Sequence, residues 1–350
     1  MNRASDTPFF SIVTPAFNAA PYIEALIDCV AAQTADSWEM IIIDDGSTDQ
    51  TLCKARLAIE RSPFPDRFIL DSMPAASGSD FLPRARAMRM ARGAYVVNID
   101  ADDLVGHDYL EQLARRIKDT DADIVYARMW RMSQHDVCTP FLPTDKYVSR
   151  HGMSRVITGK KMMRLSLGSW EVTGVGATRR TLALRSLHEF DSLMRSPAHI
   201  DSFDNENLSR LDLHLADRVT FCDKAIYRYR ITAGSVTEKI SVRSFHLLGA
   251  DASLCAFIAR SYGLRSKEHI LAQTQLFHHI FDAMRMTNKS PELADDPTVK
   301  SLTDQARSAL DRPLLKSHVS PRYLALSLLP VGMARRILAI YDRLSAGKQK

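Results

Sequence analysis

Short apolar runs alternate with helix-like patterns over the first third of the chain. Strands are expected where β-branched and aromatic residues run for four to eight positions, and helices where apolar residues recur every three or four. The predicted strands cover residues 9–14, 38–43, 67–70, 95–99 and 122–130, and the predicted helices cover residues 20–33, 48–60, 82–91 and 109–118. The first strand is expected to stop at Pro15, because proline lacks a backbone donor.

This alternation predicts an α/β fold built on a doubly wound sheet of parallel strands with right-handed connections. Open sheets of this kind bind ligands outside the carboxyl ends of their strands. Phe17 follows the first predicted strand, Asp45 follows the second, and the segment Asp-Ala-Asp-Asp at 100–103 follows the strand at 95–99. We therefore expect these three segments to meet at one edge of the sheet.

The acids at 100–103 are crowded enough to suggest specific chemistry. Neighbouring carboxylates raise each other's pKa, so a sequence that clusters them often supplies a cation. Oxygen ligands favour Mg²⁺ or Mn²⁺, which takes one or two carboxylates and leaves positions for water and phosphates. The alternative is a solvated acidic turn that caps the next helix. A second acidic cluster at 44–49, also after a strand, weighs against that alternative.

The later chain carries weaker signals. Residues 203–211 begin with acids and continue at helical spacing, residues 227–230 alternate as an edge strand would, and the chain is predicted helical from about residue 242. Five scattered cysteines without a Cys-x-x-Cys pair indicate neither a disulfide framework nor a zinc site, and favour a reducing cytoplasm. We expect no secretion signal and no transmembrane helix.

The net charge of +5 is concentrated at the C-terminus. Residues 321–350 hold six basic residues and one acid, which leaves 40 basic and 40 acidic residues in the rest of the chain. A neutral body argues against nucleic acid as a partner, since a basic face would be expected for it.

The basic tail has two interpretations. Residues 323–334 are uncharged and largely apolar, and basic residues interleaved with apolar ones follow them. This pattern is typical of an interfacial helix attracted to anionic lipid at a membrane surface. A helix that packs back on its own domain, or on a second subunit of an oligomer, produces the same pattern.

Three motifs together resemble family 2 nucleotide-sugar glycosyltransferases of the inverting, GT-A type. They are Ser-Ile-Val-Thr-Pro-Ala-Phe-Asn at 11–18, Ile-Ile-Ile-Asp-Asp-Gly-Ser-Thr-Asp at 41–49, and Gly-Ala-Tyr at 93–95 leading into Asp-Ala-Asp-Asp. The resemblance implies a GT-A domain at 8–235, with a nucleotide-binding half to about residue 130 and an acceptor half over 131–235. A helical C-terminal region with a basic amphipathic tail would follow at 236–350.

The resemblance also implies roles for individual residues. The nucleotide-sugar-binding residues would be Pro15, Phe17, Asp45, Arg84, Asp100, Ala101 and Asp102. Phe17 would pack on the base, Asp45 would contact base or ribose, and Arg84 would lie near the donor nucleotide. Asp100 and Asp102 would be the acids of the D-x-D motif, which hold the nucleotide and an Mn²⁺ or Mg²⁺ ion. Asp103 would be an additional contact.

The general base is assigned less directly. Residues 199–204 stand where the family often has Glu-Asp before a helix, which makes Asp204 the base. Phe203 replaces that glutamate, so Asp201 remains the alternative, and Asp204 is equally suited to capping its helix. Ala85 and Ala87 also replace family residues.

The implied activity is transfer of a sugar from a nucleoside diphosphate donor, taken as a UDP sugar, to an acceptor hydroxyl. The acceptor would be a carbohydrate or a lipid-linked molecule in the assembly of a surface polysaccharide or glycolipid, made in the cytoplasm or at the inner face of the membrane. The departures from the family pattern keep a catalytically inactive binding protein open. A nucleotidyltransferase is the other alternative, although residues 15–20 lack the expected glycine and lysine.

Overall fold

The computed structural model describes residues 7–133, 136–141, 155–167, 175–194, 203–231 and 240–346, with side chains to residue 342. The chain divides into two compact units. The first unit comprises residues 1–191 and 208–232, and the second comprises residues 192–207 and 233–350. The boundary therefore passes through two helices, between Asp191 and Ser192 and between Asn207 and Leu208.

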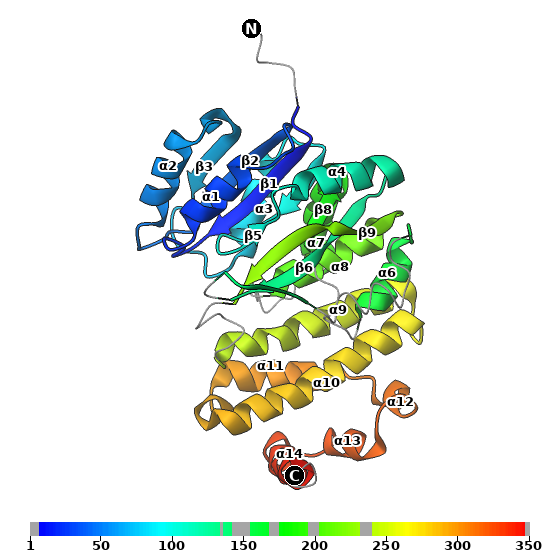
Figure 1. Ribbon diagram of the computed structural model, residues 1–350. Helices are drawn as coiled ribbons and strands as arrows, with labels where there is room; N and C mark the ends of the chain where they lie inside the picture. The colour runs from blue at the N-terminus through cyan, green and yellow to red at the C-terminus, as the bar shows by residue number, and fades with distance from the viewer. Residues whose placement is uncertain are drawn as a thin grey trace. The chain divides into compact units, whose positions relative to one another are not determined.

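The described strands of the first unit form one mixed sheet (Figure 1). They are β1 (Phe10–Ala16), β2 (Trp38–Asp44), β3 (Phe68–Ser72), β4 (Tyr95–Asn98), β5 (Leu104–Val105), β6 (Ile124–Met132), β7 (Cys138–Pro140), β8 (Gly176–Arg179) and β9 (Val219–Arg230). Their order across the sheet is β3-β2-β1-β4-β8-β6-β9-β5, and β7 pairs with β6. The strands β3, β2, β1 and β4 are parallel to one another, whereas β8 runs antiparallel to both β4 and β6.

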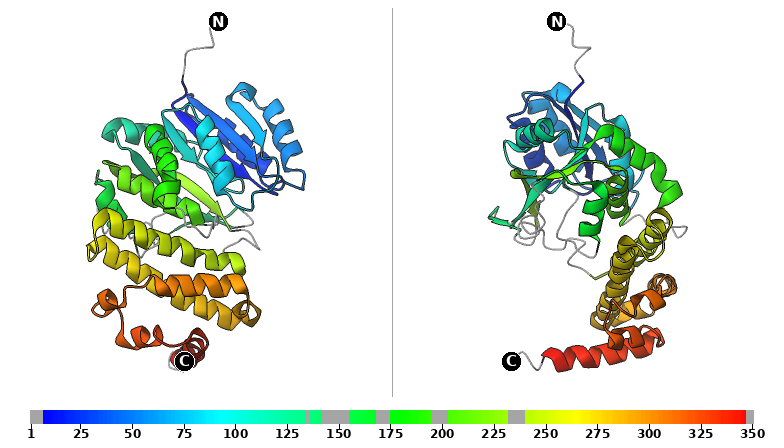
Figure 2. Two further views of the ribbon diagram at one scale, coloured as in Figure 1. Left: turned by 180° about the vertical axis from the view of Figure 1, so that it is seen from behind. Right: turned by 90° about the vertical axis from the view of Figure 1, so that its right-hand side faces the viewer.

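Helices cover both faces of this sheet, as Figures 1 and 2 show. The helices that lie wholly in the first unit are α1 (Ile23–Ala31), α2 (Thr51–Arg61), α3 (Phe81–Met90), α4 (Tyr109–Thr120) and α6 (Gly159–Ser166), with the short η1 at Pro65–Arg67. The unit boundary passes through α7 (Arg180–Leu193) and α8 (Asp204–Leu215). The helices α1, α2 and α4 lie on one face and α3 and α7 on the other. The parallel half therefore has the doubly wound arrangement that the sequence predicts.

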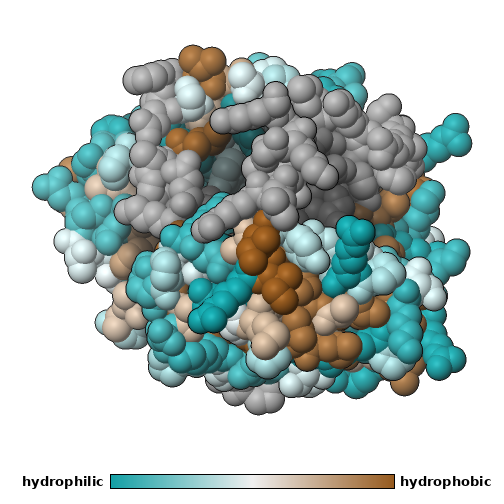
Figure 3. All heavy atoms as spheres, turned by 90° about the horizontal axis from the view of Figure 1, so that it is seen from below, coloured by the Kyte–Doolittle hydropathy of each residue, from teal (hydrophilic) through white to brown (hydrophobic). Residues whose placement is uncertain are grey.

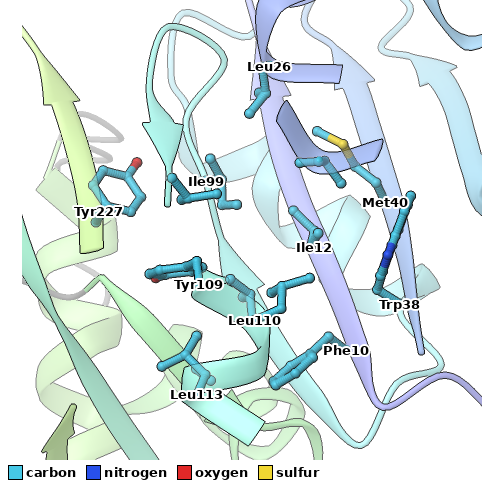
Figure 4. Packing of buried hydrophobic residues seen from close by; sticks show 14 of the residues in the cluster. Phe10, Ile12, Leu26, Trp38, Met40, Ile99, Tyr109, Leu110, Leu113 and Tyr227 are labelled. Carbon is cyan, nitrogen blue, oxygen red and sulfur yellow. The ribbon is translucent and has the colours of Figure 1, made fainter. Parts of the chain in front are cut away.

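The core of the first unit lies between the sheet and the helices α1 and α4. Alternate residues of the central strands, such as Ile12 and Met40, point into it and meet Leu26 of α1 and Leu113 of α4 (Figure 4). These four side chains are fully buried. Burial of such side chains contributes about 1.5–3 kcal/mol each, so this core fixes the strand ends that carry the acidic segments.

Two sequence expectations about strands are wrong. The first strand does not stop at Pro15 but runs to Ala16, paired with β2 throughout. Strand β4 pairs with β1 only as far as Val13 and Asn98. No residue of β4 therefore lies opposite Pro15, and the missing amide hydrogen of proline leaves no acceptor unpaired there.

The second error concerns residues 227–230. They belong to the twelve-residue strand β9, which pairs with β6 on one side and β5 on the other. The alternation of tyrosine and arginine therefore does not mark an exposed edge. Tyr227 is fully buried, and it is one of the largest buried side chains of the unit (Figure 4).

The second unit is helical beyond residue 240, as the sequence predicts. Its elements are η3 (Val242–Phe245), α9 (His246–Tyr262), α10 (Lys267–Lys289), η4 (Pro291–Ala294), α11 (Pro297–Ser308), α12 (Arg312–Leu315), α13 (Pro321–Leu326) and α14 (Val331–Ala346). Among the described residues, the stretch Val242–Tyr262 is long and apolar enough to span a membrane, and half of its apolar window is buried. Core helices also meet that criterion, and α9 packs on α10 and α11.

The tail helix α14 packs on α10 within the second unit. Arg335 donates to the carbonyl of Thr287 at 3.2 Å, and Asp342 accepts a hydrogen bond from Arg285 at 3.0 Å. Ala334 and Leu338 of α14 are fully buried. One side of the tail therefore does pack back on its own domain.

Candidate active site

Three strand ends meet at one edge of the sheet. Because β1 lies between β2 and β4 and all three are parallel, the segments that follow them are neighbours. The amide of Asp45 donates to the carbonyl of Ala16 at 2.7 Å, and the hydroxyl of Thr14 donates to the carbonyl of Ile99 at 2.8 Å. Phe17 and both acidic segments therefore lie together, although they are up to 86 positions apart in the sequence.

The first acidic turn, residues 44–49, is held by the protein's own donors. The carboxylate of Asp45 is buried and accepts the amide of Ser77 at 3.0 Å and its hydroxyl at 2.9 Å. Asp44 accepts the amide of Ser47 at 3.1 Å. Asp49 accepts the amides of Thr51 at 2.9 Å and Ala20 at 3.2 Å.

This turn is also joined to the residues that follow β1. Asn18, which has a positive φ of 50°, accepts the amide of Thr48 through its side chain at 2.9 Å. In return the amide of Asn18 donates to the hydroxyl of Ser47 at 2.9 Å. The two loops thus form one hydrogen-bonded structure beside Phe17.

A glycine is required where this turn meets the loop after β3. Gly46 has a φ of 70°, and a Cβ atom there would lie 2.5 Å from the amide nitrogen of Ala76. Only glycine fits both the backbone conformation and the close approach. The loop at 75–77 is thereby held against the acidic turn, which places Ser77 on Asp45.

The second acidic turn, residues 100–103, is held by an arginine. Arg84 of α3 is buried, and its guanidinium lies 2.7 Å from the carboxylate of Asp100 and 3.4 Å from that of Asp80. Burial opposes the charged form of Arg84, but the two carboxylates outweigh it and raise its pKa. Arg84 is therefore a fixed positive charge beside the first acid of the turn.

The last acid of the turn faces inward. Asp103 is buried, and its carboxylate accepts the hydroxyl of Tyr227 and the amide of Arg230, each at 2.7 Å. Burial, followed by the charges of Asp100 and Asp102, raises the pKa of Asp103. Asp103 thus anchors the turn to β9, and its predicted additional contact with a ligand remains a prediction.

Arg230 continues this anchor. Its Nε donates to the carbonyl of Asp102 at 2.9 Å, and one guanidinium nitrogen lies 2.8 Å from the carboxylate of Asp136. The guanidinium also lies over the ring of Tyr22, 5.3 Å from its centroid. The backbone of the second acidic turn is therefore fixed from β9.

Asp102 differs from the other acids. Its pKa is raised, first by burial and then by the charge of Asp100. Among the described residues, no side chain and no amide other than its own donates a hydrogen bond to its carboxylate, while Arg230 contributes only charge at longer range. The ionised form of Asp102 is therefore disfavoured, and a cation beside its carboxylate would stabilise it.

A divalent cation fits this donor set. The described residues contain no group of three or more His, Cys, Asp or Glu side chains that could hold a metal by themselves. Mg²⁺ and Mn²⁺ do not require one, because one or two carboxylates suffice when phosphates and water complete the coordination. Asp102 offers such a carboxylate, and Asp100 lies beside it with a half-exposed side chain.

The remaining nucleotide-site residues are placed as follows. Phe17 is 54% exposed directly after β1, as an aromatic side chain available to stack on a base would be. Pro15 is buried within β1 and Ala101 is buried in the core cluster. Their predicted contacts with a donor remain predictions.

Asp204 is the first residue of α8 and is buried. It lies in the helical turn whose amides lack helical partners, so the helix stabilises a negative charge there. Asp204 falls in the second unit, whereas the acidic turns belong to the first. Asp201, the alternative base, lies outside the described residues. The assignment of the base remains a prediction.

The sequence interpretation missed Ser77, Tyr227 and Arg230 as parts of this site. Ser77 lies in a loop that composition marks only as irregular, and its contact with Asp45 depends on Gly46. Tyr227 and Arg230 are separated from the second acidic turn by more than 120 positions. The alternation of residues along β9 predicts that Tyr227 and Arg230 lie on opposite faces of the sheet. It does not predict which strand pairs with β9.

The mixed sheet with helices on both faces has the GT-A fold. Residues 11–140 match the model of Glycosyl transferase family 2. TarS from Staphylococcus aureus, residues 1–349 in complex with UDP-GlcNAc, superposes with a TM-score of 0.73 at 18% identity, over 95% of this chain and 91% of that one. Residues 11–140 are thus similar to family 2 glycosyltransferases, and the chain has the GT-A fold of the solved TarS structures.

Curated relatives are more distant in sequence than in fold. Glycosyltransferase GlyG from Streptococcus pneumoniae is 23% identical over 228 residues, which are 65% of this chain and 72% of that protein. Glycosyltransferase GlyA from the same organism is 21% identical over 302 residues, 85% of this chain. The chain spans only 40% of the length of GlyA. A mannosyltransferase from Pyrobaculum calidifontis, PcManGT in complex with GDP-Man and Mn²⁺, has a TM-score of 0.50 at 18% identity, over 97% of this chain and 88% of that one.

Proposed function

We propose that this protein is a divalent-metal-dependent, inverting glycosyltransferase that transfers a sugar from a UDP sugar to an acceptor hydroxyl. The observation that carries the proposal is the meeting of Phe17, Asp45 and the second acidic turn at adjoining ends of β1, β2 and β4. An aromatic side chain, a buried carboxylate and an acidic pair at one sheet edge are suited to a base, a ribose and a metal-bound diphosphate.

Each part of the donor has a group suited to it. The exposed ring of Phe17 offers a stacking surface for the base. Asp45 keeps acceptor capacity for a ribose or base donor, since a carboxylate has about four lone-pair sites. Arg84 fixes Asp100 and adds positive charge close to where the diphosphate would bind.

Asp102, together with Asp100, would hold Mn²⁺ or Mg²⁺. When bound, the ion would stabilise the negative charge that develops on the leaving diphosphate. The contribution of the chain is to hold the carboxylates in place: Arg230 fixes the backbone of Asp102, and Tyr227 fixes Asp103.

The acceptor hydroxyl needs a base, because it is a weak nucleophile. Asp204, or Asp201 in its place, would remove its proton, an effect that typically contributes 10²- to 10⁴-fold. One base on the face opposite the leaving group gives inversion, by the logic that separates inverting from retaining glycosidases. Burial of Asp204 at the start of α8 supports this role.

The proposed substrates follow from the neighbours. TarS is named a poly(ribitol-phosphate) β-N-acetylglucosaminyltransferase, is 29% identical over 122 residues, and has been solved with UDP-GlcNAc. We therefore favour a UDP sugar as donor and a surface polysaccharide or glycolipid precursor as acceptor. Free cysteines among the described residues support a reducing, cytoplasmic setting.

The experiment is a donor-hydrolysis assay on the full chain with UDP-GlcNAc and other UDP sugars, with and without Mn²⁺. We expect slow release of UDP that requires Mn²⁺, that is lost in Asp102→Asn, and that falls at least 100-fold in Asp204→Asn while UDP binding persists. Asp119→Asn, an exposed change on α4, is the control. Binding of UDP without turnover in the intact chain would indicate a catalytically inactive homologue.

A further inference from the structure

The tail helix α14 is apolar on two sides, and only one of them is covered. Ala334 and Leu338 are fully buried, on the side that packs on α10. Met333 and Ile340 lie on the other side and are 53% and 55% exposed. The second of these apolar sides is therefore exposed rather than packed against the domain.

Exposed apolar side chains concentrate here. Of ten large hydrophobic side chains that are exposed among the described residues, four lie between residues 328 and 341: Leu328, Met333, Ile340 and Tyr341. Figure 3 shows a band of apolar residues over the face seen from below, where α13 and α14 lie, with hydrophilic residues along its sides. We call these four residues the tail face.

The charge around the tail face is positive. Arg322 and Arg336 are exposed, and neither is in an ion pair within the described part of the chain. Asp342 is the sole acid of residues 316–342 in the sequence, and it pairs at 3.0 Å with Arg285, which also pairs with Asp282 of α10 at 3.1 Å. The segments that carry the tail face therefore also carry two exposed arginines that are in no ion pair with a described residue.

We propose that the tail face is a docking surface for an anionic lipid bilayer. Apolar side chains that enter the headgroup boundary and arginines that contact anionic headgroups are the two contributions that hold interfacial helices at membranes. Tyr341 adds an aromatic ring with a polar tip, a type of side chain favoured at that boundary. The proposal is independent of the glycosyl-transfer chemistry.

Charge selects the bilayer over a second copy of the chain. In a two-fold dimer through this face, the same patch would meet itself, so the arginines of both copies would be brought together. Like charges at an interface oppose association, whereas an anionic surface attracts them. The tail face thus fits a negatively charged partner that also offers an apolar interior.

The test is co-sedimentation of the full chain with phosphatidylcholine vesicles, with and without about one third phosphatidylglycerol. We expect partition onto the anionic vesicles that weakens in high salt and is at least about tenfold weaker on neutral vesicles. Met333→Glu with Ile340→Glu should lower the partition constant at least about tenfold, and Arg336→Glu about tenfold. Leu264→Glu changes a leucine of the same unit that is 73% exposed outside the tail face, and should leave partition unchanged.

Three results would overturn the proposal. The first is that the intact chain does not bind vesicles, and the second is that it binds neutral and anionic vesicles equally. The third is that the tail-face variants bind as well as the intact chain, or that Leu264→Glu weakens binding as much as they do. Sedimentation velocity without vesicles tests whether a second copy of the chain binds the tail face instead. If the intact chain is a dimer, the double variant is a monomer and neither binds vesicles, the tail face is a dimer interface. Mn²⁺-dependent UDP binding should be unchanged in all these variants, which separates this proposal from the proposed function.

Discussion

The two acidic turns follow the parallel strands β2 and β4, which lie on either side of β1, yet their charges are balanced by different means. In the first turn, residues 44–49, amides and hydroxyls of the protein hold the carboxylates of Asp45 and Asp49. In the second turn, residues 100–103, a carboxylate of raised pKa, Asp102, is left without a donor from another described residue. The protein's own donors hold Asp45 and Asp49 of the first turn, whereas we propose that Asp102 of the second turn takes positive charge from a ligand.

The largest expected effect comes from Asp102→Asn. The change removes the proposed metal ligand, so we expect Mn²⁺-dependent donor hydrolysis to fall about 1,000-fold or more. It also removes a partly buried charge that Asp100 repels, so the variant should unfold at the same or a higher temperature. Loss of activity together with a large loss of stability would contradict this account.

Arg84→Ala should have the next largest effect. It removes the guanidinium that neutralises Asp100 and leaves the acids of the second turn facing one another. Loss of one partner from a buried ion pair costs about 3–5 kcal/mol, and we expect about 3 because Asp100 is half exposed. Urea unfolding measures this cost. Arg86→Ala, on the same helix and more exposed, is the control and should cost less than 1 kcal/mol.

A smaller effect is expected for Tyr227→Phe, which leaves the buried carboxylate of Asp103 without its hydroxyl donor. The loss should cost about 1–3 kcal/mol of unfolding free energy and loosen the second turn. Tyr109→Phe is a matched control, because the centroids of the Tyr109 and Tyr227 rings are 6.4 Å apart. The buried hydroxyl of Tyr109 has no hydrogen-bond partner among the described residues. If the two variants have the same free energy of unfolding in urea, the hydrogen bond between Tyr227 and Asp103 does not stabilise the protein.

Ser77→Ala tests the first turn. It removes one of the donors on Asp45 and keeps the backbone amide, so we expect a loss of about 1 kcal/mol. If the turn only positions the nucleotide, KM for the donor should rise severalfold while kcat is unchanged. A fall in kcat with unchanged KM would show that the two turns are not as different as their bonding indicates.

The smallest effect concerns pH. Slight burial raises the pKa of Asp49, but hydrogen bonds from Thr51 and Ala20 outweigh it and hold the pKa below its ordinary value. The stability this gives is present above the unfolded pKa of about 3.9 and is lost as pH falls through the folded pKa. In Asp49→Asn, the decrease in unfolding free energy at low pH should be smaller than in the intact chain by about 0.5 kcal/mol or less. Urea unfolding between about pH 3 and 5 measures it, with the exposed Asp36→Asn as control.

The comparison also shows what the sequence can and cannot predict. Buried runs such as residues 38–43 and their following acids identify the strands, the parallel sheet and the edge where the turns meet, because these depend on local periodicity. The bonding of each turn depends on distant partners. Ser77 reaches Asp45 through the close approach at Gly46, and Tyr227 reaches Asp103 because β9 pairs with the short β5. No local pattern encodes either contact, so the difference between the turns emerged only from the structure.

The most direct test of the central claim is binding of Mn²⁺ measured by electron paramagnetic resonance, in the presence of UDP, for the intact chain, Asp102→Asn and Ser77→Ala. The account predicts that UDP promotes Mn²⁺ binding to the intact chain and to Ser77→Ala, and that Asp102→Asn binds at least about 100-fold more weakly. Equal Mn²⁺ binding by Asp102→Asn and the intact chain would contradict the claim that the second acidic turn takes its missing positive charge from a metal-bound nucleotide.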